Sequence, residues 1–185
     1  MNVLIAGDFA PMSKLAKPIK EKRFSEVFKK ELSDIIKAAD FSFVNFEAPV
    51  VENGYRPIPK CGPNLNCSAE ATLAVKYLGF TGVTLANNHI LDYGTEGLRR
   101  TVKCCRNQGI DVVGVGDNLK DAGRVLYLTK DDDTLAVINC CEHEFSIATD
   151  TEAGANPAHL QSSVFKLSKD LIDSIHEEGI VAYTS

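Results

Sequence analysis

Residues Thr84–Gly94, TLANNHILDYG, place two amides, an imidazole and a carboxylate directly after an apolar segment. Asn87, Asn88 and His89 follow that segment at once, and Asp92 comes three residues after His89. Such side chains supply oxygen and nitrogen donors for a divalent metal, together with a group that can exchange protons. The structural alternative is an amide-rich loop whose polar groups bond water and backbone, with Asp92 capping the next helix.

Two other apolar segments also lead into acidic or amide side chains. Asp8 follows VLIAG, and Asn45 and Glu47 lie in FVNFE. Carboxylates, amide oxygens and an imidazole suit Mn, Fe or Zn, and one carboxylate can bridge two ions. Taken singly, Asp8 could serve a turn and Glu47 could be a solvated loop residue. Together these groups predict a metal site of one or two ions.

Hydrophobic periodicity predicts strands and helices in alternation over the first 115 residues. Strands are expected at 2–6, 41–46, 82–86 and 111–115, and helices over 24–36 (capped by Ser25), 68–78 and 95–108. The proline-rich segment 49–63 is expected to be a long loop. In open α/β sheets the ligand site lies beyond the carboxyl ends of the strands, so the polar groups above should meet at one edge.

The remaining sequence has a different pattern. Two antiparallel strands are expected from residue 125 to residue 141, followed by a polar loop over 142–162. A strand at 164–167, a helix over 168–178 and a last strand at 180–184 complete the expectation. There is no repeat or linker, so residues 1–185 are interpreted as a single α/β domain with a mixed sheet or a pair of sheets.

Composition excludes several functional classes. The net charge is −5 with 25 acidic and 20 basic residues, and no basic stripe occurs, which argues against nucleic acid as a partner. No apolar segment approaches the roughly 20 residues that span a bilayer, and no signal peptide is visible, so a cytoplasmic protein is expected. The six cysteines are expected to be buried free thiols, and the lack of a CxxC pair argues against a redox module.

Four motifs together carry a family resemblance. GDFAP, FSFVNFEAPV, GFTGVTLANNHILDYGTEGLRRT and GIDVVGVGDN occur in this order along the chain. The sequence resembles the bacterial capsule synthesis family, CapA-like, also called the poly-gamma-glutamate synthesis family. That family resembles the calcineurin-like metallophosphoesterases. The resemblance implies an α/β fold in which two mixed sheets are flanked by helices and the metal ligands lie at strand ends.

The resemblance also implies roles for individual residues. Asp8 would be a metal ligand, Glu47 would bridge the metals, and Asn88 would supply an amide-oxygen ligand. His89 would act as general acid or as a partner of a phosphate oxygen, and Asp92 would orient it. The implied reaction is attack by a metal-activated water on a phosphoester or an amide-like bond.

Further contacts to a phosphoester or poly-gamma-glutamate substrate are expected from four polar residues, Asn45, Asn87, His143 and His159. His143 lies in CEHEF after a predicted strand, and an ordinary loop is its structural alternative. His176 is expected on a solvated helix face, outside the site.

Two departures from the family pattern bear on catalysis. No histidine lies two residues after Asp8, and the chain ends at Ser185, before an HxGxE-type motif of the family. The domain is therefore expected to be incomplete at its C-terminus, with a metal site that is weakened or lost. The alternative function is a noncatalytic module that binds an anionic polymer or an assembly partner. The terminal strand 180–184 is expected to favour a homo-oligomer.

Binding of an anionic polymer by an acidic protein would need local cations. The candidates from the sequence are Arg56, Lys60, Arg99 and Arg100.

Overall fold

The computed structural model describes residues 1–142, 145–158 and 180–184 of the chain. The chain divides into two compact units, which we treat separately. The N-terminal unit comprises Asn2–Leu85 and His89–Val112, and the C-terminal unit comprises Met1, Ala86–Asn88 and Val113–Ser185.

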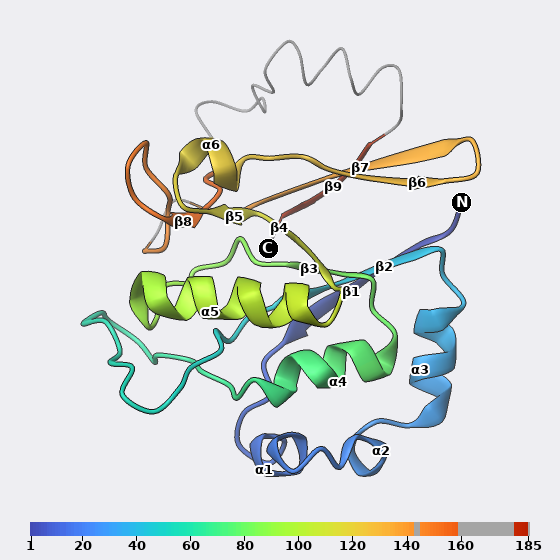
Figure 1. Cartoon of the computed structure of the whole chain (residues 1–185), viewed down its shortest axis with the longest axis horizontal. Coiled ribbons are helices and arrows are strands. Elements are labelled where there is room, and N and C mark those ends of the chain that lie inside the picture. The colour runs from blue at the N-terminus through green and yellow to red at the C-terminus, as the bar shows by residue number, and fades with distance from the viewer. Residues whose placement is uncertain (143–144, 159–179, 185) are drawn as a thin grey trace. The chain divides into compact units, whose positions relative to one another are not determined.

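A four-stranded sheet with the order β1-β2-β3-β4 forms the centre of the N-terminal unit (Figure 1). Its strands are β1 (Val3–Phe9), β2 (Phe41–Phe46), β3 (Gly82–Thr84) and β4 (Asp111–Val113). β1 and β3 both run parallel to β2, so their carboxyl ends lie at one edge of the sheet. β1 is longer than predicted, and it carries Asp8 into register with Asn45 after an irregularity between Ile5 and Asp8.

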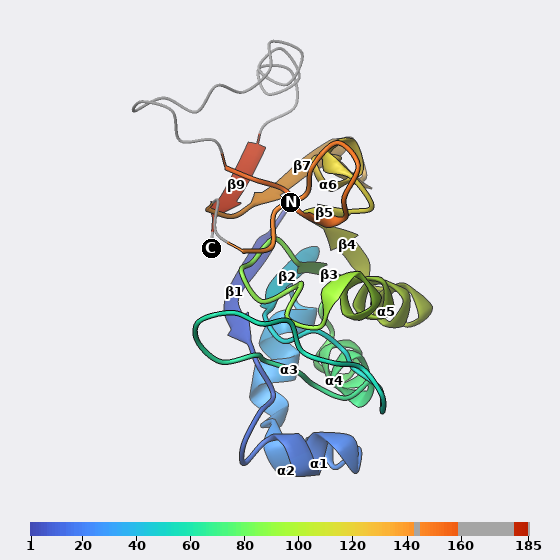
Figure 2. The same cartoon turned by 90° about the vertical axis from the view of Figure 1, so that its left-hand side faces the viewer.

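Two helices lie next to each other on one face of this sheet, as Figures 1 and 2 show. They are α4 (Glu70–Leu78) and α5 (Gly94–Asn107), and both bury apolar side chains, such as Val75 and Leu98. α4 ends as predicted at Gly79, whose φ of 100° is the left-handed conformation that favours glycine. The prediction of these helices from periodicity is confirmed to within two residues.

The helix predicted over 24–36 is interrupted. The structure has α1 (Ala16–Lys20), α2 (Phe24–Val27) and α3 (Lys30–Lys37), with an extended backbone at Phe28 and Lys29 between the last two. At the break, the centre of the Phe28 ring lies 6.4 Å from the centre of the Phe9 ring, a contact between residues far apart in the sequence.

Burial along α3 does not follow the apolar side chains of the sequence. Ile35 is 61% exposed, whereas Ser33 is buried and its hydroxyl donates to the Leu78 carbonyl oxygen. The predicted cap at Ser25 is wrong, since Ser25 lies inside α2 and no side chain caps that helix.

The C-terminal unit contains two small sheets. Its elements are β5 (Val115–Gly116), α6 (Leu119–Ala122), β6 (Leu126–Lys130), β7 (Asp133–Cys140), β8 (Gly154–Ala155) and β9 (Ile180–Thr184). The predicted hairpin is confirmed, because β6 and β7 pair antiparallel, and β9 pairs parallel with β7. The strand and helix predicted over 164–178 lie outside the described residues.

Within the described residues β9 stands at one end of the order β6-β7-β9, and its pairing with a second copy stays a prediction. The α/β class with mixed sheets is confirmed. In the part of the chain that the structure describes, no helix has the length and apolar character required to cross a membrane.

The cysteines are free, and all but Cys61 are buried, largely as predicted. Burial raises the pKa of the Cys67 thiol, and it raises that of Cys105 to about 12. Thiols of this kind are poor nucleophiles at neutral pH, so they contribute to packing and not to redox chemistry.

Candidate active site

Asp8, Asn45 and Glu47 meet at the carboxyl edge of the parallel sheet. The Asn45 side chain is 1% exposed, and its Nδ2 donates to Asp8 Oδ1 at 2.9 Å and also to Glu47 Oε2. Thr84 on β3 donates from Oγ1 to Asn45 Oδ1 at 3.4 Å, which fixes the amide orientation. One amide group thus holds two carboxylates side by side.

The electrostatics of this pair favour a cation. The pKa of Glu47 is raised, first by burial and then by the negative charge of Asp8, against the opposing effects of His89 and Asn45. Two adjacent carboxylates repel each other, and a bound cation relieves that repulsion. The oxygen donors of Asp8 and Glu47 therefore fit a divalent metal in their chemistry. Over residues 1–142, 145–158 and 180–184, no three His, Cys, Asp or Glu side chains form a ready metal cage.

Glu47→Gln is expected to stabilise the metal-free protein at neutral pH. A carboxyl group whose pKa is raised by folding contributes stability below its unfolded pKa and loses it as pH rises through the folded value. Thermal unfolding of chelator-treated protein should show a higher Tm for Glu47→Gln at pH 7, and the difference should shrink as pH falls into the carboxyl range. Added Mn²⁺ should raise the Tm of the original protein more than that of the variant. Equal Tm values at pH 7 without metal would contradict this electrostatic account.

His89 and Asp92 form a hydrogen-bonded pair in the turn between β3 and α5. His89 Nδ1 lies 2.7 Å from Asp92 Oδ2, and Nε2 lies 3.9 Å from Glu47 Oε1. An ionised carboxylate only accepts hydrogen bonds, so Nδ1 carries the hydrogen and Nε2 is the ring nitrogen on the side of Glu47. Asp92 therefore contacts the ring of His89, and its role in orienting that ring stays a prediction.

Asp92 is buried and is contacted by the long loop after β2, which Figure 1 shows between β2 and α4. The Lys60 ammonium forms an ion pair with Asp92 Oδ1, and the Leu65 N–H donates to Oδ2 at 2.6 Å. Backbone hydrogen bonding adds the Ile58 N–H, which donates to the Asp92 carbonyl oxygen at 2.9 Å. The proline-rich loop is therefore anchored on Asp92. No local pattern in the sequence marks Lys60 for this position.

Asn87 and Asn88 belong to the C-terminal unit, unlike His89. Asn87 is buried, and the Asn88 carbonyl oxygen accepts a hydrogen bond of 3.0 Å from Ser146 Oγ. Just before them, the Ala86 N–H donates to Asn139 Oδ1 at 2.6 Å. Asn139 and Ser146 therefore fix the backbone of this segment. Neither residue was predicted from the sequence. For Asn139, the sequence feature that could have indicated a role is a single amide within the otherwise apolar end of β7.

Gly114→Ala is expected to destabilise the protein by about 1–3 kcal/mol or more. Gly114 has φ of 94°, and a Cβ there would lie 2.1 Å from Asn139 Oδ1 and 2.9 Å from the Ala86 side chain. Denaturant unfolding measures the loss. Gly123→Ala is the matched control, because its φ is −82° and the nearest atoms to its Cβ lie at 3.4 Å. Equal stability of the two variants would contradict the close packing around Asn139.

The other predicted substrate contacts, His143 and His159, lie outside the described residues, as does His176.

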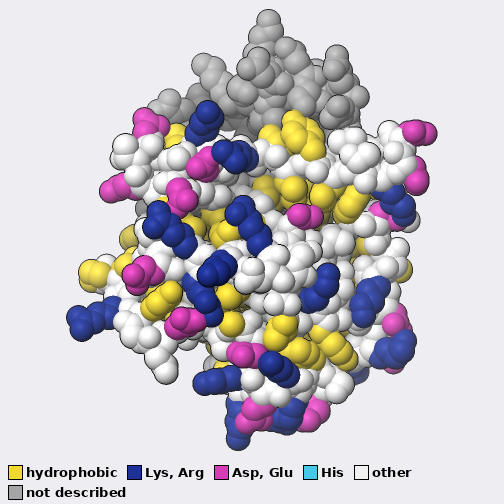
Figure 3. Space-filling view, viewed as in Figure 1, with side chains coloured by type: hydrophobic (Ala, Val, Ile, Leu, Met, Phe, Trp, Pro, Cys, Tyr) yellow, Lys and Arg dark blue, Asp and Glu magenta, His cyan; other side chains and the backbone are white. Residues whose placement is uncertain are grey.

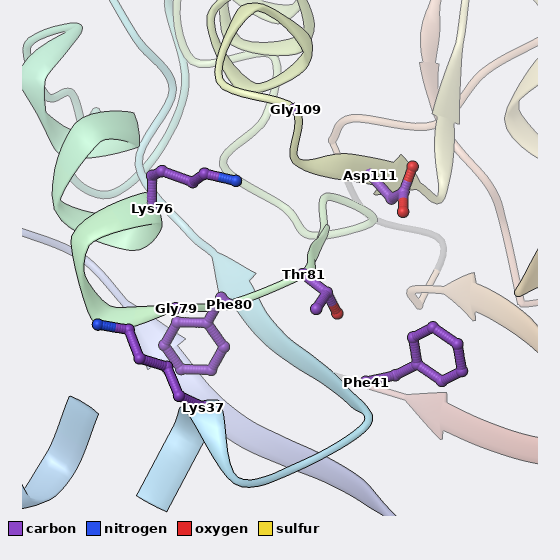
Figure 4. A pocket seen from close by; sticks show the side chains of 8 residues that line it. All are labelled: Lys37, Phe41, Lys76, Gly79, Phe80, Thr81, Gly109 and Asp111. Atoms are coloured by element: carbon purple, nitrogen blue, oxygen red, sulfur yellow. The ribbon is translucent and has the colours of Figure 1, made fainter. Parts of the chain in front are cut away.

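A separate pocket of about 480 Å³ lies at the opposite, amino-terminal edge of the sheet (Figure 4). Phe41 begins β2 and Asp111 begins β4, and both line it. Its lysines are exposed, and the Lys37 ammonium lies 5.9 Å from the centre of the Tyr77 ring. The lysines Lys37 and Lys76 and the residues that follow α4 and α5 line this pocket, and Asp8, Asn45 and Glu47 do not.

Binding of an anionic polymer would require a group of surface cations that are not already paired with acidic side chains. On the face seen in Figure 3, both Lys or Arg and Asp or Glu side chains occur, and several Lys and Arg side chains lie near one another at the middle of the face. Lys60 is engaged by Asp92, and Arg100 forms an ion pair with Glu52. Two of the four cations proposed from the sequence are thus neutralised locally.

Residues 2–182 match the family described as bacterial capsule synthesis protein PGA_cap. The chain belongs to this family. The PGA_cap match confirms the resemblance seen in the sequence motifs.

Two relatives in this family are informative about length. The capsule biosynthesis protein CapA of Bacillus anthracis is 33% identical over 129 residues, which are 69% of this chain and 31% of that protein. The PGA biosynthesis protein CapA of Bacillus subtilis strain 168 is 29% identical over 131 residues, which are 70% of this chain and 34% of that protein. The chain therefore spans about a third of the length of these relatives.

Among solved structures, the NAD nucleotidase NadN of Haemophilus influenzae matches with a TM-score of 0.51 at 12% identity. The match covers 100% of this chain and 34% of the nucleotidase chain. At this identity the likeness concerns the fold alone. Over the length of this chain the two proteins therefore share a similar fold.

Proposed function

We propose that this PGA_cap chain is a metal-dependent hydrolase of phosphoester bonds that takes part in capsule or poly-gamma-glutamate synthesis. The observation that supports it best is the carboxylate pair Asp8 and Glu47 on one amide, beside the His89 ring. The names of the two CapA relatives support the biological setting.

Asp8 and Glu47 would hold the metal, and Asn88 remains the predicted amide-oxygen ligand. A bound divalent ion lowers the pKa of a water molecule and polarises a phosphoryl oxygen. Asn45 would order the two carboxylates, since its amide already contacts both of them. Its role in this proposal is therefore to support the ligands, while Asn87, His143 and His159 remain the predicted substrate contacts.

His89 would exchange a proton with the substrate through Nε2. Because Nδ1 is bound to Asp92, the ring cannot rotate freely, and Nε2 stays on the side of Glu47. A fixed ring of this kind gains catalytic power from its orientation.

The test is hydrolysis by the 185-residue chain after reconstitution with Mn²⁺, Fe²⁺ or Zn²⁺. The substrates are p-nitrophenyl phosphate, bis-p-nitrophenyl phosphate and poly-gamma-glutamate, the last followed by its chain length. Metal-dependent release of p-nitrophenol that stops with chelator supports the proposal. Absence of turnover on every substrate, with metal bound, would contradict it and favour the noncatalytic polymer-binding or assembly module.

A further inference from the structure

We infer that Lys60 is a positioning residue for His89 and that it acts through the Asp92 carboxylate. The inference rests on the proposed function only in taking His89 as the group that meets the substrate. Its structural basis lies within the N-terminal unit and needs no bound metal.

The first observation is the burial of the lysine. The Lys60 side chain is 4% exposed and Asp92 is 0% exposed, although Lys60 comes from a long proline-rich loop. Removing an ammonium and a carboxylate from water is costly, and an apolar pair of similar volume is often as stable or more stable. Stability alone therefore gives little reason for a lysine at this position.

The second observation is how the two oxygens of Asp92 are divided. Oδ1 is paired with the Lys60 ammonium, whereas Oδ2 accepts from the Leu65 N–H and from His89 Nδ1. Without Lys60, Oδ1 would be a buried acceptor that has lost its cation. The free energy of the buried carboxylate would then be lower if it turned so that Oδ1 met another hydrogen-bond donor. Lys60 thereby keeps Oδ2 directed at His89.

The third observation is the position of the ammonium beside the imidazole. Lys60 Nζ lies 3.3 Å from His89 Nδ1, so lysine, carboxylate and imidazole form one compact group. An ammonium only donates, so with hydrogen on Nδ1 the lysine and the imidazole do not bond to each other, and both donate to the Asp92 carboxylate. The Ile58 and Leu65 backbones, on either side of Lys60 in the sequence, both bond to Asp92. These two hydrogen bonds hold the backbone of the loop on both sides of Lys60, and they thereby position its ammonium group beside Asp92. The consequence is a single His89 tautomer, with hydrogen on Nδ1 and with Nε2 on the side of Glu47.

The decisive experiment measures the His89 tautomer by long-range ¹⁵N–¹H NMR on the metal-free 185-residue chain. The original protein should show the Nδ1–H form. Lys60→Met should populate the Nε2–H form, and Lys60→Arg, which keeps the charge, should restore the Nδ1–H form at least in part. Lys30→Met is the matched control, because it removes an exposed ion pair with Asp34 and should leave His89 unchanged.

A folded Lys60→Met protein with an unchanged Nδ1–H signal would overturn the inference. If that variant does not fold, by circular dichroism, Lys60→Gln replaces it, since glutamine keeps a donor and removes the charge. A folded Lys60→Gln protein with the original tautomer would likewise overturn it.

Turnover separates this inference from the proposed function. In an active protein, Lys60→Met should lower kcat by about 10–100-fold with little change in KM, as expected for a residue that orients another. If no hydrolysis is found, the proposed function fails while the tautomer measurement still decides the role of Lys60. An unchanged kcat together with a changed tautomer would show that the orientation of His89 does not limit the reaction, and would overturn the positioning role.

Discussion

Asp8→Ala is expected to abolish metal-dependent hydrolysis, with a loss in kcat/KM of at least about 100-fold, since removing residues that merely support a ligand already costs 10–100-fold. The substitution removes one of the two carboxylates that share the Asn45 amide. Glu47 would then be the only carboxylate of the pair, and the attraction of this site for a divalent ion would fall. Initial rates over a series of Mn²⁺ concentrations measure the effect.

Asp111→Ala is the matched control for that substitution. Asp111 is an exposed aspartate at the start of β4, at the opposite edge of the same sheet. Its loss should leave the rate and the Mn²⁺ dependence unchanged. Equal rates for Asp8→Ala and the original protein would remove Asp8 from the site.

His89→Ala is expected to lower kcat by about 10²–10⁴-fold, the usual range for a positioned acid–base group. The loss should fall mainly on kcat, because the carboxylates that would hold the metal remain in place. Steady-state rates of the metal-loaded original protein and of the variant over a range of substrate concentrations separate kcat from KM.

Tyr93→Phe is a suitable control near His89. It removes the hydroxyl that accepts from Asn66 Nδ2 and leaves the contacts of His89 with Asp92 intact. Activity should stay close to that of the original protein. A His89→Ala protein with unchanged kcat would show that the ring takes no part in the reaction.

The positions of the parallel strands and the convergence of the acidic residues at one edge could be predicted from the sequence, because both follow from local patterns. β2 has the predicted boundaries, since an apolar run bounded by polar residues marks a buried parallel strand. The carboxyl-end rule for parallel strands then placed Asn45 and Glu47 near Asp8, as hydrogen bonds confirm.

Breaks within elements could not be predicted in the same way. The strand expected over 111–115 is split at Gly114, where the positive φ separates β4 from β5. The break between α2 and α3 lies where Phe28 contacts Phe9. Such contacts join residues far apart in the sequence, and a periodic pattern carries no information about them.

Residues that support the site were the least predictable. Lys60 lies in a proline-rich loop, where a lysine is ordinarily exposed, and its burial depends on Asp92, 32 positions later. Asn139 contacts the Ala86 backbone across 53 positions. Both interactions are long-range, so a single sequence shows the polar residue without its partner.

The measurement that tests the central claim most directly is the metal content per chain, by elemental mass spectrometry on protein purified without chelator and reconstituted with Mn²⁺, Fe²⁺ or Zn²⁺. The account predicts about one or two ions per chain, lost in Asp8→Ala and retained in Asp111→Ala. An original protein that retains no ion, or an Asp8→Ala protein that retains as many, would contradict a metal site at Asp8 and Glu47.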